Sequence, residues 1–120
     1  MRNAPVTFAV LLLAAVGVLT ASMSSRALGA SLEGGKAIYE ESCAKCHGTA
    51  GAGDGRAGRS LEHKPTAFNV TSKLAPDDKL FKATREGGKA VGQSGDMEGF
   101  PKLSDEQIRD VIAYVKTLAK

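Results

Sequence analysis

The pattern of apolar and polar positions is most regular near the C-terminal end of the chain. Between residues 104 and 119, apolar side chains recur three and four positions apart, which is the spacing of one face of an α-helix. Ser104 and Gln107 have the spacing of a capping box at the start of this segment. The pattern therefore predicts a helix from Ser104 to about Ala119, with Tyr114 at the edge of the buried stripe. The stripe consists of Ile108, Val111, Ile112, Val115 and Leu118.

A helix is also predicted near the middle of the N-terminal half, from about Ser31 to Lys45. Ser31 is a favourable N-cap residue, and Ile38 and Tyr39 are placed to face the core. Gly35 lies four residues before Tyr39, so the two residues share one face of this helix.

A further helix is predicted from about Pro76 to Glu86. Proline is favoured at the first helical position, and the acidic residues that follow it suit the positive end of the helix dipole. Gly87 and Gly88 are expected to end the helix. Its short inner stripe would consist of Leu80, Phe81 and Thr84.

The segments between these helices are rich in glycine and carry no strand-like alternation. Residues 48–58 contain glycine and alanine around a Gly53-Asp54-Gly55 turn, and residues 87–99 contain five glycines. Irregular stretches of this length are unusual in a small domain unless they serve its function. The sequence therefore predicts an all-α fold whose long loops wrap a cofactor.

The chemistry of the chain is concentrated in the C-x-x-C-H pattern of residues 43–47, which uses both cysteines of the chain. This pattern is typical of covalent haem c attachment, in which two thiols add to the vinyl groups of the porphyrin and the histidine binds the iron. A thioredoxin-like pair would need a βαβ context, and a structural zinc site would need four ligands in a chain that is poor in them. We therefore predict one covalently bound haem c, with Cys43, Cys46 and His47 in its site.

The other axial ligand of the iron is predicted from the remaining side chains. Electron-transfer cytochromes usually have methionine or histidine in this position. Met1 starts the chain and Met23 lies in the apolar N-terminal region, which leaves Met97 in the second glycine-rich loop. The sequence predicts His47 and Met97 as the metal ligands. His63, the only other histidine, is expected at the surface, with bis-histidine ligation as the alternative.

Residues 1–29 have the organisation of a secretory signal peptide. Arg2 precedes a largely apolar run from Pro5 to Leu19, small residues follow, and cleavage is expected near residues 27–30. The run is short for a membrane span of about 20 residues, and an uncleaved membrane anchor is the alternative. Both interpretations place the domain of residues 30–120 outside the cytoplasm, in the bacterial periplasm.

The charge balance of the chain changes when this segment is removed. The whole chain has 16 basic and 13 acidic residues; because Arg2 and Arg26 lie in the signal segment, the remaining domain keeps 14 basic and 13 acidic residues. A domain so close to neutral, without a lysine or arginine run and with few aromatic residues, argues against nucleic-acid binding.

Several motifs follow one another between Leu32 and Leu118. They are Cys43-x-x-Cys46-His47-Gly48, Gly51-x-Gly53-Asp54-Gly55, Lys64-Pro65-x-x-Phe68, Met97-x-x-Phe100, Leu103-Ser104-Asp105-Glu106-Gln107-Ile108 and Ala113-Tyr114-Val115. Together they resemble the class I c-type cytochromes, in particular small monohaem domains similar to the cytochrome cbb3 and c6 types.

The resemblance implies the class I cytochrome c fold, in which three to five helices wrap around one covalently bound haem c. It also implies that the first and last helices cross, with Gly35 allowing Tyr114 to approach the first helix. Two positions depart from the family pattern: Glu98 and Arg56 each stand where the family often has proline. Because Arg56 alters the first loop, which often supplies the carbonyl that orients the ring of His47, that carbonyl is not assigned from the sequence.

The predicted function is that of a soluble periplasmic electron carrier. The iron would alternate between the ferrous and ferric states with both ligands kept, so we expect no enzyme, no catalytic residue and no small-molecule substrate. A monomer would meet redox partner proteins such as a membrane oxidase or reductase or a periplasmic dehydrogenase. The alternatives are a haem c subunit of a periplasmic dehydrogenase or oxidase complex, and a haem enzyme or gas sensor with an open sixth position.

Overall fold

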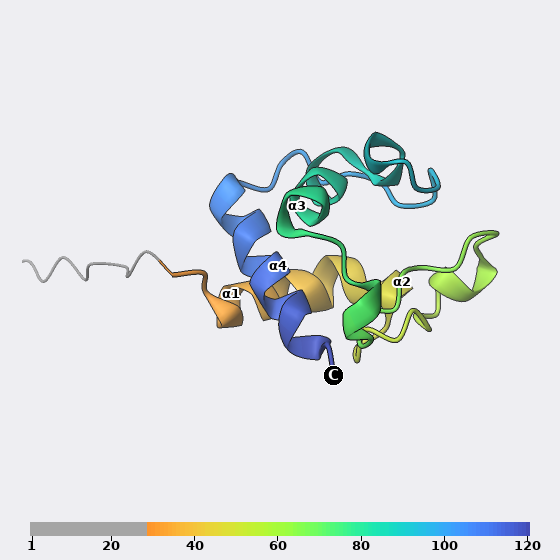
Figure 1. Cartoon of the computed structure of the whole chain (residues 1–120), viewed down its shortest axis with the longest axis horizontal. Coiled ribbons are helices and arrows are strands. Elements are labelled where there is room, and N and C mark those ends of the chain that lie inside the picture. The colour runs from red at the N-terminus through yellow and green to blue at the C-terminus, as the bar shows by residue number, and fades with distance from the viewer. Residues whose placement is uncertain (1–28) are drawn as a thin grey trace, which may run out of the picture.

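The structure is a computed structural model that describes residues 29–120, and within this range it contains helices and loops but no strand. The α-helices are α1 (Leu32–Ile38), α2 (Ala44–His47), α3 (Asp77–Glu86) and α4 (Asp105–Leu118) (Figure 1). The predicted all-α fold is confirmed over the described residues. Among them, no helix is both long and apolar enough to cross a membrane. The predicted signal peptide lies outside the described range, apart from Gly29.

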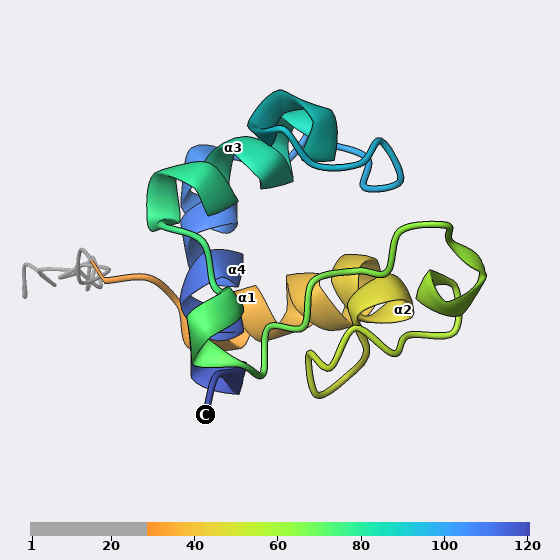
Figure 2. The same ribbon diagram turned by 45° about the vertical axis from the view of Figure 1, so that its right-hand side comes forward.

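The first helical run is continuous from Leu32 to His47. A π-helical turn of residues Tyr39–Cys43 (η1) joins α1 to α2, so the three elements form one uninterrupted helical run (Figure 2). The Oγ atom of Ser31 accepts a hydrogen bond from the backbone N–H of Gly34 at 3.0 Å, which confirms the predicted N-cap. The run ends two residues later than predicted, and the π-helical turn was not predicted because apolar spacing does not distinguish it from an α-helical turn.

Helix α4 begins and packs as its sequence predicts. The Ser104 Oγ accepts a hydrogen bond from the backbone N–H of Gln107, and the Gln107 side chain accepts one from the backbone N–H of Ser104, which completes the capping box. Burial of an aliphatic side chain stabilises the fold by roughly 1.5–3 kcal/mol. The residues buried on this stripe are Ile108, Val111, Ile112 and Val115, with Leu118 half-buried beside them.

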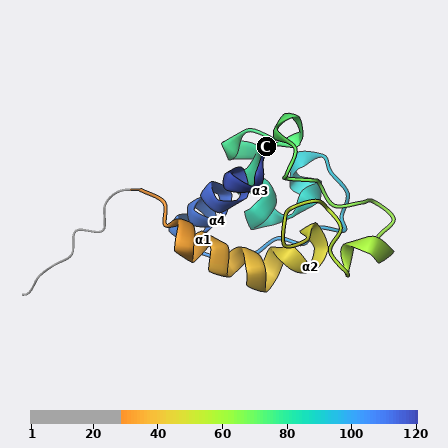
Figure 3. The same cartoon turned by 90° about the horizontal axis from the view of Figure 1, so that it is seen from below.

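Helices α1 and α4 cross in direct backbone contact (Figure 3). A Cβ atom at Gly35 would overlap the carbonyl oxygen of Asp110 and lie 3.0 Å from the backbone nitrogen of Val111. The close approach expected at Gly35 is confirmed, but the atoms nearest to this glycine belong to the α4 backbone and not to Tyr114. Tyr114 instead packs against the fully buried ring of Tyr39, with ring centroids 5.4 Å apart.

A buried carboxylate supports the same crossing. Asp110 is only 8% exposed, and its Oδ1 atom accepts a hydrogen bond of 2.7 Å from the backbone N–H of Ser31. Asp110 thereby satisfies a backbone donor at the N-terminal end of α1, in addition to the Ser31 side-chain cap. This link joins residues 79 positions apart, and the apolar periodicity of α4 gave no signal for it.

Helices α3 and α2 lie apart from each other, and residues of both line the central cavity (Figure 2). Helix α3 begins at Asp77, with Pro76 as the N-cap residue instead of the predicted first helical residue. The predicted stop is confirmed, because Gly87 has a φ of +93° and follows the last helical residue, Glu86.

Phe81 does not join the inner stripe predicted for α3. Its ring lies beside two guanidinium groups, with the Cζ atom of Arg85 5.3 Å and that of Arg109 5.4 Å from the ring centroid. The face of an aromatic ring attracts such cations. The side chain therefore bridges α3 to α4, and the other two members of the predicted stripe, Leu80 and Thr84, line the central cavity.

Replacing Gly35 with alanine tests the helix crossing. Gly35→Ala is expected to lower the free energy of unfolding by about 1–3 kcal/mol, because the added methyl group must displace the α4 backbone. Denaturant unfolding of the cofactor-loaded protein, followed by circular dichroism, measures this change.

The neighbouring substitution Gly34→Ala is the matched control. A Cβ atom there would meet only side-chain atoms, Ser31 Oγ at 3.2 Å and Asp110 Oδ2 at 3.3 Å. Helix propensity favours alanine by roughly 1 kcal/mol, so this variant is expected to stay within about 1 kcal/mol of the wild type. Equal stabilities of the two variants would contradict the backbone contact.

Candidate functional site

A cavity of about 580 Å³ lies between the first helical run, α3 and α4. All four residues that the sequence predicts as cofactor-binding contribute to its wall: Cys43, Cys46, His47 and Met97. The rest of the wall is largely apolar, as a site for a flat hydrophobic cofactor requires. Its apolar members include Phe68, Leu74, Leu80, Val111, Ile112 and Val115.

The ring of His47 is held from two sides. Its Nδ1 atom lies 3.0 Å from the carbonyl oxygen of Thr66. Because that oxygen can only accept, Nδ1 carries the proton and Nε2 keeps the lone pair that a metal needs. The ring also stacks on Phe68, with centroids 4.3 Å apart and planes inclined by 15°. Thr66 thus supplies the carbonyl that was not assigned from the sequence. It could not be assigned there because every residue type has a backbone carbonyl.

Burial favours the neutral form of this histidine. His47 is 8% exposed, and desolvation lowers its pKa although the hydrogen bond to Thr66 opposes the shift. A neutral imidazole with a fixed tautomer is the form that ligates iron.

The two cysteines come from the end of the π-helical turn and from α2. Cys43 is the last residue of η1 and Cys46 lies three positions later, a spacing that brings both side chains to one side of the helical run. Burial raises the pKa of the Cys43 thiol to about 11, so that the thiol stays protonated at neutral pH.

The first glycine-rich loop closes onto the end of α2. Of residues 48–58, all of which are described, none lines the cavity. The irregular region between the first two predicted helices does line it, but through its later part, residues 61–76. Amide groups of residues 48–58 instead satisfy carbonyls that would be left unpaired at the helix end. The hydrogen bonds are Gly53 N–H to His47 O (2.8 Å), Gly55 N–H to Cys46 O (3.1 Å) and Ala57 N–H to Lys45 O (2.9 Å).

Glycine is required where this loop meets the helix end. A Cβ atom at Gly55 would lie 2.5 Å from the carbonyl oxygen of Lys45 and 2.6 Å from that of Cys46. Tyr39 adds a further contact, because its buried hydroxyl donates a hydrogen bond of 2.7 Å to the carbonyl of Gly48. The loop therefore fixes the backbone that carries Cys46 and His47 instead of forming the wall itself.

The loop that carries Met97 does line the cavity, as predicted for the second glycine-rich segment. It is fastened to the C-terminal end of α3 by two backbone hydrogen bonds, Gly88 N–H to Met97 O at 3.0 Å and Phe100 N–H to Thr84 O at 2.8 Å. A Cβ atom at Gly99 would lie 2.5 Å from the carbonyl of Arg85, so this glycine permits the close approach. Gly88 therefore does more than follow the end of a helix, because its amide holds the Met97 backbone.

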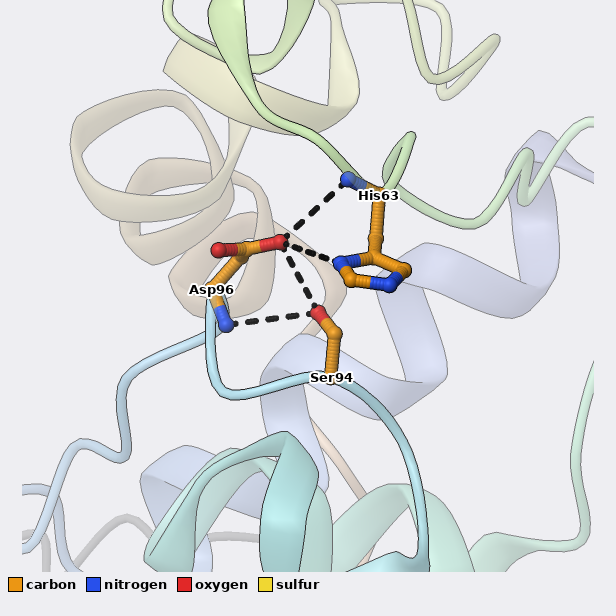
Figure 4. Close-up of polar contacts among 3 residues, drawn as sticks. All are labelled: His63, Ser94 and Asp96. Atoms are coloured by element: carbon orange, nitrogen blue, oxygen red, sulfur yellow. Dashed lines mark hydrogen bonds and ion pairs between the residues drawn. The ribbon is translucent and has the colours of Figure 1, made fainter.

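His63 lies at the rim of the same cavity and is 63% exposed. Its Nδ1 atom donates a hydrogen bond of 3.1 Å to Asp96 Oδ2, and its backbone N–H donates one of 3.4 Å to the same oxygen (Figure 4). Ser94 Oγ adds a third at 3.1 Å. These hydrogen bonds, that of the His63 side chain foremost, lower the pKa of Asp96. The expected surface position of His63 is confirmed, and its contact with Asp96 was not predicted.

The donor set of this cavity fits haem c. Two thiols in C-x-x-C spacing, an imidazole and a thioether are the groups that attach this cofactor and ligate its iron. Within residues 29–120, no group of three or more His, Cys, Asp or Glu side chains is placed to hold a metal ion by itself.

Comparisons with known proteins agree with these features. The family model of cytochrome c matches residues 32–119. Cytochrome c-555 of Chlorobaculum thiosulfatiphilum is 34% identical over 82 residues, which cover 68% of this chain and 88% of that protein. A chain of the reducing HAO-like protein complex of Kuenenia stuttgartiensis superposes with a TM-score of 0.61 and 29% identity over 72% of this chain. The present chain covers 42% of that longer chain.

The stack of Phe68 on His47 is open to a direct test. Phe68→Leu keeps an apolar side chain but removes the aromatic face, so we expect a loss of about 1–2 kcal/mol in the free energy of unfolding of the cofactor-loaded protein. Phe81→Leu, on an aromatic residue outside the cavity, is the control and is expected to cost less. A loss at Phe81 as large as that at Phe68 would contradict the importance of the stack.

Proposed function

The chain belongs to the cytochrome c family, and from this premise we propose that it is a monohaem one-electron carrier with His47 and Met97 as its axial ligands. Members of this family bind covalently attached haem c. In the proposal, the thiols of Cys43 and Cys46 form the two thioether bonds.

One observation carries this proposal: the four residues converge on a single apolar cavity although Met97 is 50 positions from His47 in the chain. His47 comes from the end of the first helical run, whereas Met97 comes from a loop fastened to α3, across from α2. Ligands that come from different elements around one cavity suit an iron held from two sides.

The surrounding residues explain how the site would suit electron transfer. When bound, the haem supplies a reversible one-electron change at its iron. The apolar wall disfavours added charge, and methionine ligation raises the reduction potential, so both features favour the ferrous state. His47 keeps its tautomer through Thr66, and Met97 keeps its place through Gly88, so that neither ligand needs to move when the electron passes.

We further propose that the protein works in the periplasm after removal of the N-terminal segment. The proposal follows from the composition of residues 1–29 and from the requirement for haem c attachment outside the cytoplasm. Its partners would be redox proteins, such as a membrane oxidase or reductase or a periplasmic dehydrogenase, that meet it briefly as a monomer.

A second function is favoured by the solved structure that this chain resembles. Because that structure is a chain of a reducing HAO-like protein complex, the present protein could serve as the haem c subunit of a periplasmic oxidoreductase. Affinity purification of the full-length protein from its native host separates the two functions. A partner retained in fixed stoichiometry through gel filtration supports the subunit, and a protein that elutes alone supports the free carrier.

Met97→Ala tests the proposed sixth ligand. The ferric wild-type protein is expected to show the absorption band that accompanies a Met–iron bond. The variant is expected to lose this band while keeping its haem, because the thioether bonds do not involve Met97. His63→Ala is the control and is expected to keep the band.

Three results would overturn this ligation. Survival of the band in Met97→Ala would exclude Met97 as the ligand, and absence of the band in the wild type would favour the bis-histidine alternative with His63. Rapid carbon monoxide binding by the native ferrous protein would indicate an open sixth position and hence a haem enzyme or gas sensor.

Single substitutions of the cysteines test the covalent attachment. Cys43→Ala and Cys46→Ala are each expected to leave at most one thioether bond. The absorption spectrum of the haem in alkaline pyridine should then shift, because one vinyl group stays unreacted. Ser42→Ala, next to Cys43 on the cavity wall, should keep the spectrum of the wild type. An unchanged spectrum in either cysteine variant would show that the missing thiol forms no bond to the cofactor.

A further inference from the structure

One short segment contacts both sides of the proposed iron site. The carbonyl of Thr66 accepts the hydrogen bond from His47 Nδ1, and three positions earlier His63 donates to Asp96, the residue directly before Met97. The segment His63–Thr66, which we call the strap, therefore links the histidine ligand to the loop of the methionine ligand.

The strap is itself held in place by the protein. A Cβ atom at Gly53 would lie 2.5 Å from the carbonyl oxygen of Pro65, and one at Gly58 would lie 2.7 Å from the Cγ atom of that proline. The Nζ atom of Lys64 also donates a hydrogen bond of 2.7 Å to the carbonyl of Arg59. Because the strap rests on the loop that closes α2, its position is set by the same backbone that carries Cys46 and His47.

The opposite loop is exposed at its tip, where Gly92, Gln93 and Gly95 precede Asp96. From residues 29–120, Asp96 Oδ2 accepts three hydrogen bonds, and the two that come from outside the loop are both from His63 (Figure 4). Hydrogen bonds to an ionised acceptor stabilise more than neutral ones, so His63 is placed to hold this loop against the strap.

We propose that His63 is a positioning residue for the sixth ligand: its hydrogen bonds to Asp96 keep the Met97 loop closed over the iron site and make replacement of Met97 by an outside ligand less favourable. The inference rests on the proposed ligation by His47 and Met97. It assigns His63 a role at the rim of the site that differs from direct bonding to iron.

Imidazole binding to the ferric protein tests this role. Titration with imidazole, followed by loss of the Met–iron band, measures the apparent affinity of an outside ligand for the sixth position. His63→Ala, which removes the side-chain hydrogen bond, is expected to bind imidazole about two- to tenfold more tightly than the wild type, the range of one hydrogen bond. Asp96→Ala, which also removes the hydrogen bond from the His63 backbone N–H, is expected to bind it at least as tightly. The double variant should gain no more than Asp96→Ala, because that substitution already removes the contact that His63→Ala breaks.

A rescue variant and a neutral neighbour complete the experiment. His63→Asn places an amide N–H near the position of the imidazole Nδ1 and should restore much of the wild-type affinity. Glu62→Ala, at an exposed neighbour of His63, should bind imidazole as the wild type does. As a readout that does not involve the iron, hydrogen exchange of the His63 backbone amide should be faster in Asp96→Ala.

The outcomes separate this inference from the proposed ligation. A wild type without the Met–iron band would overturn His47/Met97 ligation and the inference with it. A wild type with the band, combined with unchanged imidazole affinity in His63→Ala and Asp96→Ala, would overturn the role of His63 alone. Fully additive effects in the double variant would also overturn it, because they would show that the two side chains act separately.

Discussion

The backbone contact between α1 and α4 at Gly35 is the constraint on which the remaining structure depends. It joins residues far apart in the sequence, and the buried carboxylate of Asp110 strengthens it by binding the backbone of Ser31. With the two helices crossed there, the apolar stripe of α4 forms one wall of the cavity and the far end of the first helical run forms another. Val111 takes part in both features, because its backbone nitrogen lies at the crossing and the residue lines the cavity, so the crossing directly positions one wall of the site.

Periodicity and capping predicted the helices well because these signals are local. The Ser104–Gln107 capping box and the apolar stripe of α4 need no knowledge of the rest of the fold. The exact position of Phe81 could not be predicted in this way, because its partners include Arg109 on another helix. The same limit applies to Gly35: the family resemblance implies a close approach there, but only the assembled structure shows that the backbone of Asp110 makes it.

The same difference between local signals and long-range contacts applies to the candidate site. That Cys43, Cys46, His47 and Met97 line one cavity could be anticipated, because their residue types suggest a shared chemistry in a chain with few alternatives. The backbone groups that hold His47 and Met97 in place could not be predicted from the sequence. Thr66 acts through its carbonyl and Gly88 through its amide, and every residue except proline offers the same amide. His63 and Asp96 were visible as chemical groups, but their 33-residue separation hid their pairing.

The π-helical turn Tyr39–Cys43 has a consequence for the comparison of related chains. A π-helical turn closes its hydrogen bond over one residue more than an α-helical turn, and this turn lies between the crossing at Gly35 and the cavity residue Cys43. A relative with a regular α-helix there would need one residue fewer to span the same distance. Alignments of this chain with such relatives should therefore place a one-residue gap between Gly35 and Cys43, within a helix, where gaps are usually penalised.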